Sequence, residues 1–145
     1  MHSVERSVLV PYSASQMFDL VADVEKYPEF MPWCGGSSVA HRDENGMQAS
    51  VTISFAGLKQ TFTTRNVHEY PNRIELELVD GPFSLLKGQW LFMPLAVDAC
   101  KVMFTLQYQF SSRTLETLVG PVFNRIATSF IDSFTQRAND CYGGV

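Results

Sequence analysis

The spacing of apolar and polar residues changes period several times along the chain, and each change marks an expected element. Residues 3–10 carry Val4, Val8 and Val10 at even positions, which predicts a strand with one buried face. Pro11 ends this pattern, because proline has no amide hydrogen to donate to a neighbouring strand. The first element is therefore expected to be a half-buried strand.

A helical pattern follows over residues 14–22. Ser13 and Gln16 have the spacing of a capping box. The next apolar residues recur at helical intervals: Met17, Leu20, Val21 and Val24. Two prolines in the segment 27–36, YPEFMPWCGG, prevent the helix from continuing, so a turn or broken helix is expected there.

Between residues 36 and 110 the period returns to two, with turn residues at intervals that fit an antiparallel meander. Asn45-Gly46 has the sequence of a tight hairpin turn. In the segment 61–68, Phe62 and Val67 are out of phase, and a β-bulge would account for them. About six antiparallel strands are expected, and the last one has the most regular inner face: Val102, Phe104, Leu106, Tyr108 and Phe110.

The final pattern predicts a long helix over about 113–141, ended at Gly143. Its apolar stripe consists of Leu115, Leu118, Val119, Val122, Phe123, Ile126, Ala127, Phe130, Ile131 and Phe134. Gly120-Pro121 predicts a kink or an irregular first turn. This helix has a stripe long enough to cover the dry face of the sheet.

This order of elements predicts one α+β domain over residues 1–145, with helices on one face of a curved antiparallel sheet. A strongly curved sheet and a helix often enclose more space than side chains fill. We therefore expect the function to lie in that space.

Composition narrows the class of protein. The 145 residues are 46% hydrophobic and 18% charged, which excludes intrinsic disorder. The net charge of −4 argues against DNA or another polyanion as a partner bound by bulk charge. The three cysteines form no CxxC pair, there is no signal-peptide pattern, and no 18 apolar residues run together. A reduced, cytoplasmic protein is expected.

The sequence contains no recognisable catalytic constellation. The three histidines are far apart and lack metal-ligand spacing, and Cys34 has no base near it in the sequence. Glu75 and Glu77 alternate with apolar residues and should face water. We therefore expect no catalytic residue, no metal, no catalytic cofactor and no enzyme activity.

The segment 80–95, DGPFSLLKGQWLFMPL, is more apolar than one strand face can bury. Its large side chains should line a cavity, pack under a loop or form an exposed binding patch. A cavity lined by Phe and Leu with few polar groups favours a lipid, an isoprenoid or a polycyclic ligand over a sugar or nucleotide.

Three segments carry a resemblance to a known family. MFDLVADVEKYPEFMPWC at 17–34, GPFSLLKGQWLF at 81–92 and GPVFN in the C-terminal helix resemble the coenzyme-Q-binding START-like family. Its bacterial members are often called RatA-type ribosome-association toxins or polyketide cyclase/dehydrase proteins. The resemblance covers nearly the whole chain and implies the helix-grip (START-like, SRPBCC) fold, in which a sheet wraps around the C-terminal helix and encloses an apolar tunnel.

The resemblance also implies that the tunnel holds ubiquinone or a similar isoprenoid, as a bound ligand in support of respiration. The positions that match the family's motifs are Tyr27, Pro28, Phe30, Pro32, Trp33 and Cys34, then Pro82, Phe83, Leu86, Gly88, Trp90 and Phe92. Periodicity alone predicts further wall residues: Phe55, Leu76, Leu78, Phe104 and Leu106 on the sheet, with Phe123, Ile126 and Phe130 on the helix.

Several alternatives stay open at this point. The segment 27–34 can be a rigid plug with Trp33 packed inward, instead of or together with a ligand contact. Transient contact with a membrane surface, peripheral to the inner membrane, is a further alternative, through Phe30, Met31, Trp33 and the loop 83–86.

The family names add two other functions. One is a toxin that associates with the large ribosomal subunit and blocks subunit joining, for which a basic cluster would be needed around Lys59, Arg65, Arg73 and Lys87. The other, less favoured, is a polyketide cyclase or dehydratase, whose internal acid or base would come from His68, Tyr108 or Asp98.

Overall fold

The computed structural model describes residues 2–55 and 57–143. Seven antiparallel strands form one sheet in the order β1-β7-β6-β5-β4-β3-β2. The strands are β1 (His2–Val10), β2 (Cys34–Asp43), β3 (Gly46–Phe55), β4 (Leu58–Glu69), β5 (Arg73–Asp80), β6 (Phe83–Ala96) and β7 (Ala99–Phe110). The helices are α1 (Ala14–Ala22), the 3₁₀ turn η1 (Val24–Lys26), α2 (Tyr27–Phe30) and α3 (Arg113–Tyr142).

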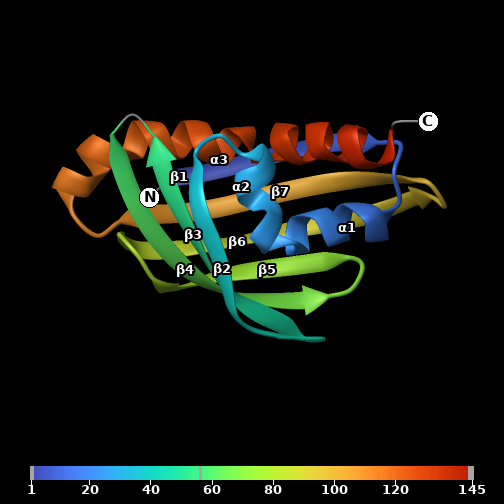
Figure 1. Ribbon diagram of the computed structural model, residues 1–145, viewed down its shortest axis with the longest axis horizontal. Helices are drawn as coiled ribbons and strands as arrows, with labels where there is room; N and C mark the ends of the chain where they lie inside the picture. Colours follow the sequence, from blue (N-terminus) through green and yellow to red (C-terminus); the bar gives the residue numbers. More distant parts are fainter. Residues whose placement is uncertain (1, 56, 144–145) are drawn as a thin grey trace.

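The sheet curves around α3. Figure 1 shows β5, β6 and β7 running along the direction of α3, while β2, β3 and β4 cross them steeply. The short helices α1 and α2 lie on the same side of the sheet as α3. The expected α+β architecture, with a curved antiparallel sheet and a long C-terminal helix, is confirmed.

Local sequence signals explain the N-terminal elements. The Ser13 hydroxyl accepts from the Gln16 amide at 3.1 Å and the Gln16 side chain accepts from the Ser13 amide at 2.9 Å, so the predicted capping box begins α1. After α1 the chain forms η1 and α2, with Pro28 in the first turn of α2. The predicted broken helix is confirmed.

Strand β4 explains the two residues that were out of phase. Phe62, Thr64 and Asn66 point to the interior, whereas Val67 is on the outer face with 45% of its surface exposed. The register shifts where Thr63 pairs with Asp80 and Thr64 with Leu78, so the extra residue belongs to β5. The irregularity is therefore on the neighbouring strand, and the inner face of β4 is partly polar.

Helix α3 supplies the other side of the core. Its buried residues are Val119, Phe123, Ile126, Ala127, Ile131, Phe134 and Ala138, and each large apolar side chain buried in this way contributes about 1.5–3 kcal/mol. The prediction that Leu118 belongs to the buried apolar stripe is wrong, because its side chain is exposed. The helix continues through Gly120-Pro121 as one element, and its first turns incline away from the rest in Figure 1.

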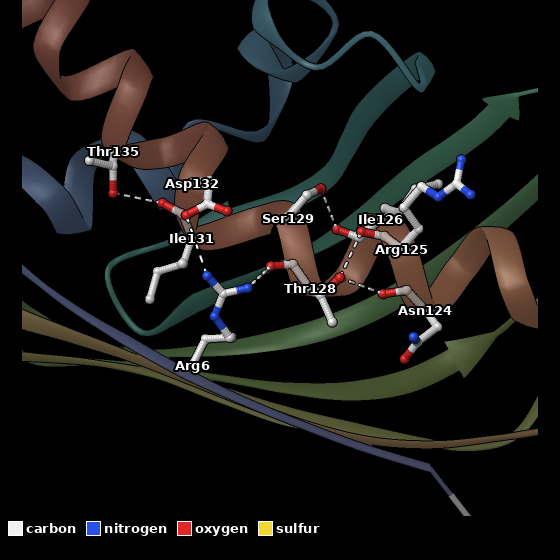
Figure 2. A network of polar contacts seen from close by, with 9 residues as sticks. All are labelled: Arg6, Asn124, Arg125, Ile126, Thr128, Ser129, Ile131, Asp132 and Thr135. Carbon is white, nitrogen blue, oxygen red and sulfur yellow. Dashed lines mark hydrogen bonds and ion pairs between the residues drawn. The ribbon is translucent and has the colours of Figure 1, made fainter.

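Polar contacts fix α3 to the edge strand β1 (Figure 2). The Arg6 guanidinium donates to the Thr128 carbonyl at 2.7 Å and to the Asp132 carboxylate at 3.5 Å. The Thr128, Ser129 and Thr135 hydroxyls donate to carbonyls of the preceding turn of the same helix. Of these contacts, the two from Arg6 join α3 to the sheet, and the hydroxyl bonds lie within the helix.

In the part of the chain that the structure describes, the helices are all too short or too polar to cross a bilayer.

Candidate functional site

A cavity of about 70 Å³ lies between the inner face of the sheet and α3. The helical segment before β2, the strands β3 to β7 and α3 all contribute to its wall. The lining residues are Val21, Val24, Tyr27, Met31, Trp33, Ala49, Val51, Phe62, Thr64, Asn66, Ile74, Leu76, Leu86, Trp90, Phe104, Leu106, Phe123, Phe130 and Phe134. Most of this surface is apolar, so the space suits an apolar molecule.

Residues 23–33, here called the strap, close one side of the cavity. Met31 and Trp33 point inward and are buried. Ion pairs hold the strap at the surface, Glu25 with Arg42 at 2.8 Å and Glu29 with Arg137 at 3.4 Å. The strap is therefore both a plug, as the alternative interpretation of 27–34 predicted, and a wall of the cavity.

Aromatic rings form the opposite wall. Trp90 packs on Phe104 with ring centroids 4.4 Å apart and meets Phe134 edge-on at 5.2 Å. Trp33 packs on Phe130 at 5.4 Å. Both tryptophans of the chain therefore lie in the cavity wall, where their fluorescence can report on a bound molecule.

Two polar side chains of β4 interrupt the apolar lining. The Thr64 hydroxyl donates to the Asn66 side-chain oxygen at 2.7 Å, and both residues are buried. The Trp33 indole nitrogen is also buried and has no hydrogen-bond partner among the described residues. Sequence analysis missed Thr64 and Asn66, although their even spacing from Phe62 was a signal that they share its face.

The structure brings many of the predicted ligand-binding residues together. Those that line the cavity are Tyr27, Trp33, Leu76, Leu86, Trp90, Phe104, Leu106, Phe123 and Phe130. Others are wholly or partly buried but pack elsewhere in the core: Phe30, Cys34, Leu78, Phe83, Phe92 and Ile126. The lining also includes residues that were not predicted to bind ligand, among them Met31, Ala49, Val51, Ile74 and Phe134.

Three of the predicted positions, Phe55 of the wall and Pro28 and Pro32 of the entry segment, lie outside the cavity lining. Phe55 is 39% exposed because it is the last residue of β3 and pairs with Leu58 at the hairpin, outside the lining. Pro28, in the first turn of α2, and Pro32, in the turn before β2, are both exposed. The two prolines shape the strap and do not contact the cavity.

The residues proposed for membrane contact are mostly inside the molecule. Met31, Trp33, Phe83 and Leu86 are buried, so their side chains are not available to a bilayer surface in this structure. Exposed apolar residues gather instead at the tip of the β6–β7 hairpin: Met93, Leu95 and Val97.

The predicted basic cluster is interleaved with carboxylates. Glu77 lies between Arg65 and Lys87 in the strand register, along an outer groove of about 550 Å³. Arg73 pairs with Glu69 at 2.5 Å and with Glu75 at 3.5 Å. This face presents mixed charge, and such a surface does not concentrate the positive potential that RNA backbone contact requires.

The acid and base candidates are not gathered at the cavity. Asp98 is exposed in the β6–β7 turn, and Tyr108 donates to the Asn124 side chain at 3.2 Å. Burial raises the pKa of Tyr108 and lowers the pKa of His68. Neither side chain lines the cavity.

Tyr27, within the strap, and Cys34, the first residue of β2, are poor reactive groups. Tyr27 donates to the Val21 carbonyl at 2.5 Å, and burial raises its pKa. Burial also raises the pKa of the Cys34 thiol, which disfavours a nucleophilic thiolate. Within residues 2–55 and 57–143, histidines, cysteines and carboxylates form no group of three that could hold a metal ion.

Comparisons with known proteins agree with this architecture. The chain is 48% identical to "Ribosome association toxin RatA" of Vibrio cholerae over 143 residues, which are 99% of each chain. It is 28% identical to "Coenzyme Q-binding protein COQ10, mitochondrial" of Drosophila melanogaster, over 88% of this chain and 54% of that one. The solved Zhui aromatase/cyclase of Streptomyces sp. R1128 superposes with a TM-score of 0.83 at 15% identity, over 99% of this chain and 98% of that one.

The family resemblance stated from the sequence is confirmed by these relatives and by a family match that covers residues 10–135. At 15% identity the aromatase/cyclase shows the shared fold and no more. The chain belongs to the polyketide cyclase / dehydrase and lipid transport family.

Proposed function

We propose that this protein binds a hydrophobic small molecule of the isoprenoid quinone class between its sheet and α3, without changing it chemically. The observation that carries this proposal is an apolar cavity in the centre of the core, walled by Trp33 and Trp90. The titratable side chain in its lining is Tyr27, whose hydroxyl is already hydrogen-bonded. The quinone-binding name of the Drosophila relative supports the choice of ligand.

The size of the cavity sets a condition on binding. Its volume of about 70 Å³ is well below the roughly 300–1,000 Å³ of ordinary ligand sites. The wall must therefore move to admit an isoprenoid, and each methylene group it then buries contributes about 0.8 kcal/mol.

We infer that the strap is the part of the wall that moves. Its ion pairs, Glu25 with Arg42 and Glu29 with Arg137, are partly exposed and are worth about 0–1 kcal/mol each. The strands on the opposite side are held by continuous backbone ladders, which cost more to separate.

The experiment is to extract the protein, purified from a quinone-producing host, with organic solvent and to identify the released lipids by mass spectrometry. A second readout is quenching of Trp33 and Trp90 fluorescence by a decyl-tailed ubiquinone added to the delipidated protein. Ala49→Leu fills the cavity with an apolar side chain, and Ala96→Leu at the exposed β6–β7 hairpin is the matched control.

We expect about one quinone per chain in the wild type and in Ala96→Leu, and at least a tenfold loss in Ala49→Leu. Circular dichroism confirms that each variant is folded. The absence of both extracted quinone and quenching in the wild type would overturn the proposal.

A second candidate function is association with the large ribosomal subunit. The 48% identity to a ribosome association toxin over nearly the full chain favours it. The mixed charge around Arg65, Glu77 and Lys87 favours contact with a ribosomal protein over RNA at this face.

Sucrose-gradient sedimentation of ribosomes, with and without the protein, tests this candidate. We expect the protein to migrate with the large subunit and to reduce the fraction of joined ribosomes. The charge-reversed variant Arg65→Glu/Lys87→Glu tests whether the outer groove takes part. An unchanged subunit profile without co-migration would remove this candidate.

A further inference from the structure

Strand β4 places polar groups where the neighbouring strands place apolar ones. Thr64 and Asn66 are 7% and 5% exposed and line the cavity. In the register, Asn66 lies between Met47 of β3 and Leu76 of β5. A buried amide in such apolar surroundings is costly unless its hydrogen bonds are made.

The hydrogen bond within this pair leaves one group unused. The Asn66 oxygen accepts from the Thr64 hydroxyl at 2.7 Å, and Asn66 lines the cavity, so its Nδ2 group is the remaining donor of that side chain. No acceptor among the described residues is hydrogen-bonded to it. Thr64 thus orients the amide of Asn66 without completing its hydrogen bonds.

The indole of Trp33 adds a fully buried donor to the same cavity lining. The Trp33 indole nitrogen is unpaired among the described residues, and Trp33 is 5% exposed. A polar network that served the fold alone would be expected to pair its members. Two unused donors in one apolar cavity are instead suited to a ligand that carries oxygen acceptors.

We propose that Asn66 Nδ2 donates a hydrogen bond to a carbonyl oxygen of the ligand's head group, that Trp33 Nε1 donates to a second oxygen, and that Thr64 is a positioning residue for Asn66. The inference rests on the proposed function and deepens it. It places the polar head against β4 and leaves the apolar tail to the aromatic wall. The ligand class is then a ketone or quinone attached to a hydrocarbon, and a pure hydrocarbon lipid is disfavoured.

The test compares two probes of the same shape, 1,4-naphthoquinone with its two carbonyl oxygens and naphthalene with none. Equilibrium dialysis against the full chain gives a Kd for each. The variants are Asn66→Leu, which removes the donor, and Thr64→Val, which removes the hydroxyl that orients it. Thr63→Val is the matched control, because Thr63 lies next to Thr64 on the opposite face of β4 and bonds to Ser50.

We expect Asn66→Leu to raise the Kd for naphthoquinone about tenfold, because a buried carbonyl loses its donor. Thr64→Val should raise it about threefold, and Thr63→Val should leave it unchanged. The Kd for naphthalene should stay within twofold in every variant, which a merely structural role for Asn66 would not produce.

The outcomes separate this inference from the proposed function. The role of Asn66 would be overturned if the Kd values for the two probes changed equally in the variants. It would also be overturned if the Kd for naphthoquinone did not change in Asn66→Leu and Thr64→Val. In both cases the cavity would remain a binding site. Failure of the wild type to bind either probe, together with no extracted quinone, would overturn both.

Discussion

Strands β7 and β4 both alternate in and out of the same interior, yet they fill it differently. The inner residues of β7 are all 5% exposed or less and consist of Cys100, Val102, Phe104, Leu106, Tyr108 and Phe110. The inner residues of β4 are Phe62, Thr64, Asn66 and His68, of which Phe62 and His68 are only partly buried. Both strands line the cavity, but β7 fills its inner face with tightly buried, mainly apolar side chains, whereas β4 adds the buried polar pair Thr64 and Asn66.

The difference follows from what each strand faces. β7 packs directly against α3. The ring centroids of Phe123 and Tyr108 are 4.7 Å apart, and those of Phe130 and Phe104 are 5.6 Å apart. Thr64 and Asn66 of β4 also border the cavity, and their side chains hydrogen-bond to each other. Residues that give a site its chemistry often reduce stability, and here the two roles fall on different strands.

The largest expected effect is on the β7 side. Phe104→Ala should lower the free energy of unfolding by about 3–5 kcal/mol, because it removes a fully buried ring that packs on Trp90. Urea denaturation measures this change. Phe55→Ala, at the exposed end of β3, is the control and should cost less than about 1 kcal/mol. Similar losses in the two variants would contradict the assignment of Phe104 to the packed core.

A smaller effect of opposite sign is expected on the β4 side. The double variant Thr64→Val/Asn66→Leu should raise the free energy of unfolding by about 1 kcal/mol, because it replaces a partly satisfied polar pair in an apolar cavity. The same urea experiment measures it. A loss of stability would mean that the pair serves the fold, and the functional role of Asn66 would lose its support.

The smallest effect concerns His68, at the end of the inner face of β4. Burial first, and then the charge of Arg42, lower its pKa below the ordinary value of 6.5, while Asp43 opposes the shift. The unfolded chain therefore binds more protons than the native protein as pH falls below about 6.5. Stability should decrease with falling pH in that range, with a slope of at most about 1.4 kcal/mol per pH unit from this group.

Urea midpoints measured between pH 7.5 and 5 test this prediction. His68→Gln should flatten the pH dependence. An equal slope in wild type and His68→Gln would assign the acid sensitivity to other groups.

Much of the fold could be predicted from periodicity and local signals. The capping box at Ser13, the prolines after α1 and the long stripe of α3 each depend on a few neighbouring residues, and the structure contains all of them. The family resemblance also rests on local segments, and the match over residues 10–135 confirms it. Half of the predicted ligand-binding and entry-segment positions line the cavity. Leu76, Phe104 and Leu106 were found by strand alternation, and the others by helical periodicity or by the family motifs.

The rest depended on how the elements meet in space. Phe55 has the phase of an inner residue but lies at an exposed hairpin, while Thr64 and Asn66 look like surface residues and lie in the cavity. The charges of Arg65, Glu77 and Lys87 offset one another only because the register of three strands sets them side by side. Periodicity assigns a side chain to a face, whereas curvature, register and the covering helix decide whether that face meets packed rings, a cavity or water.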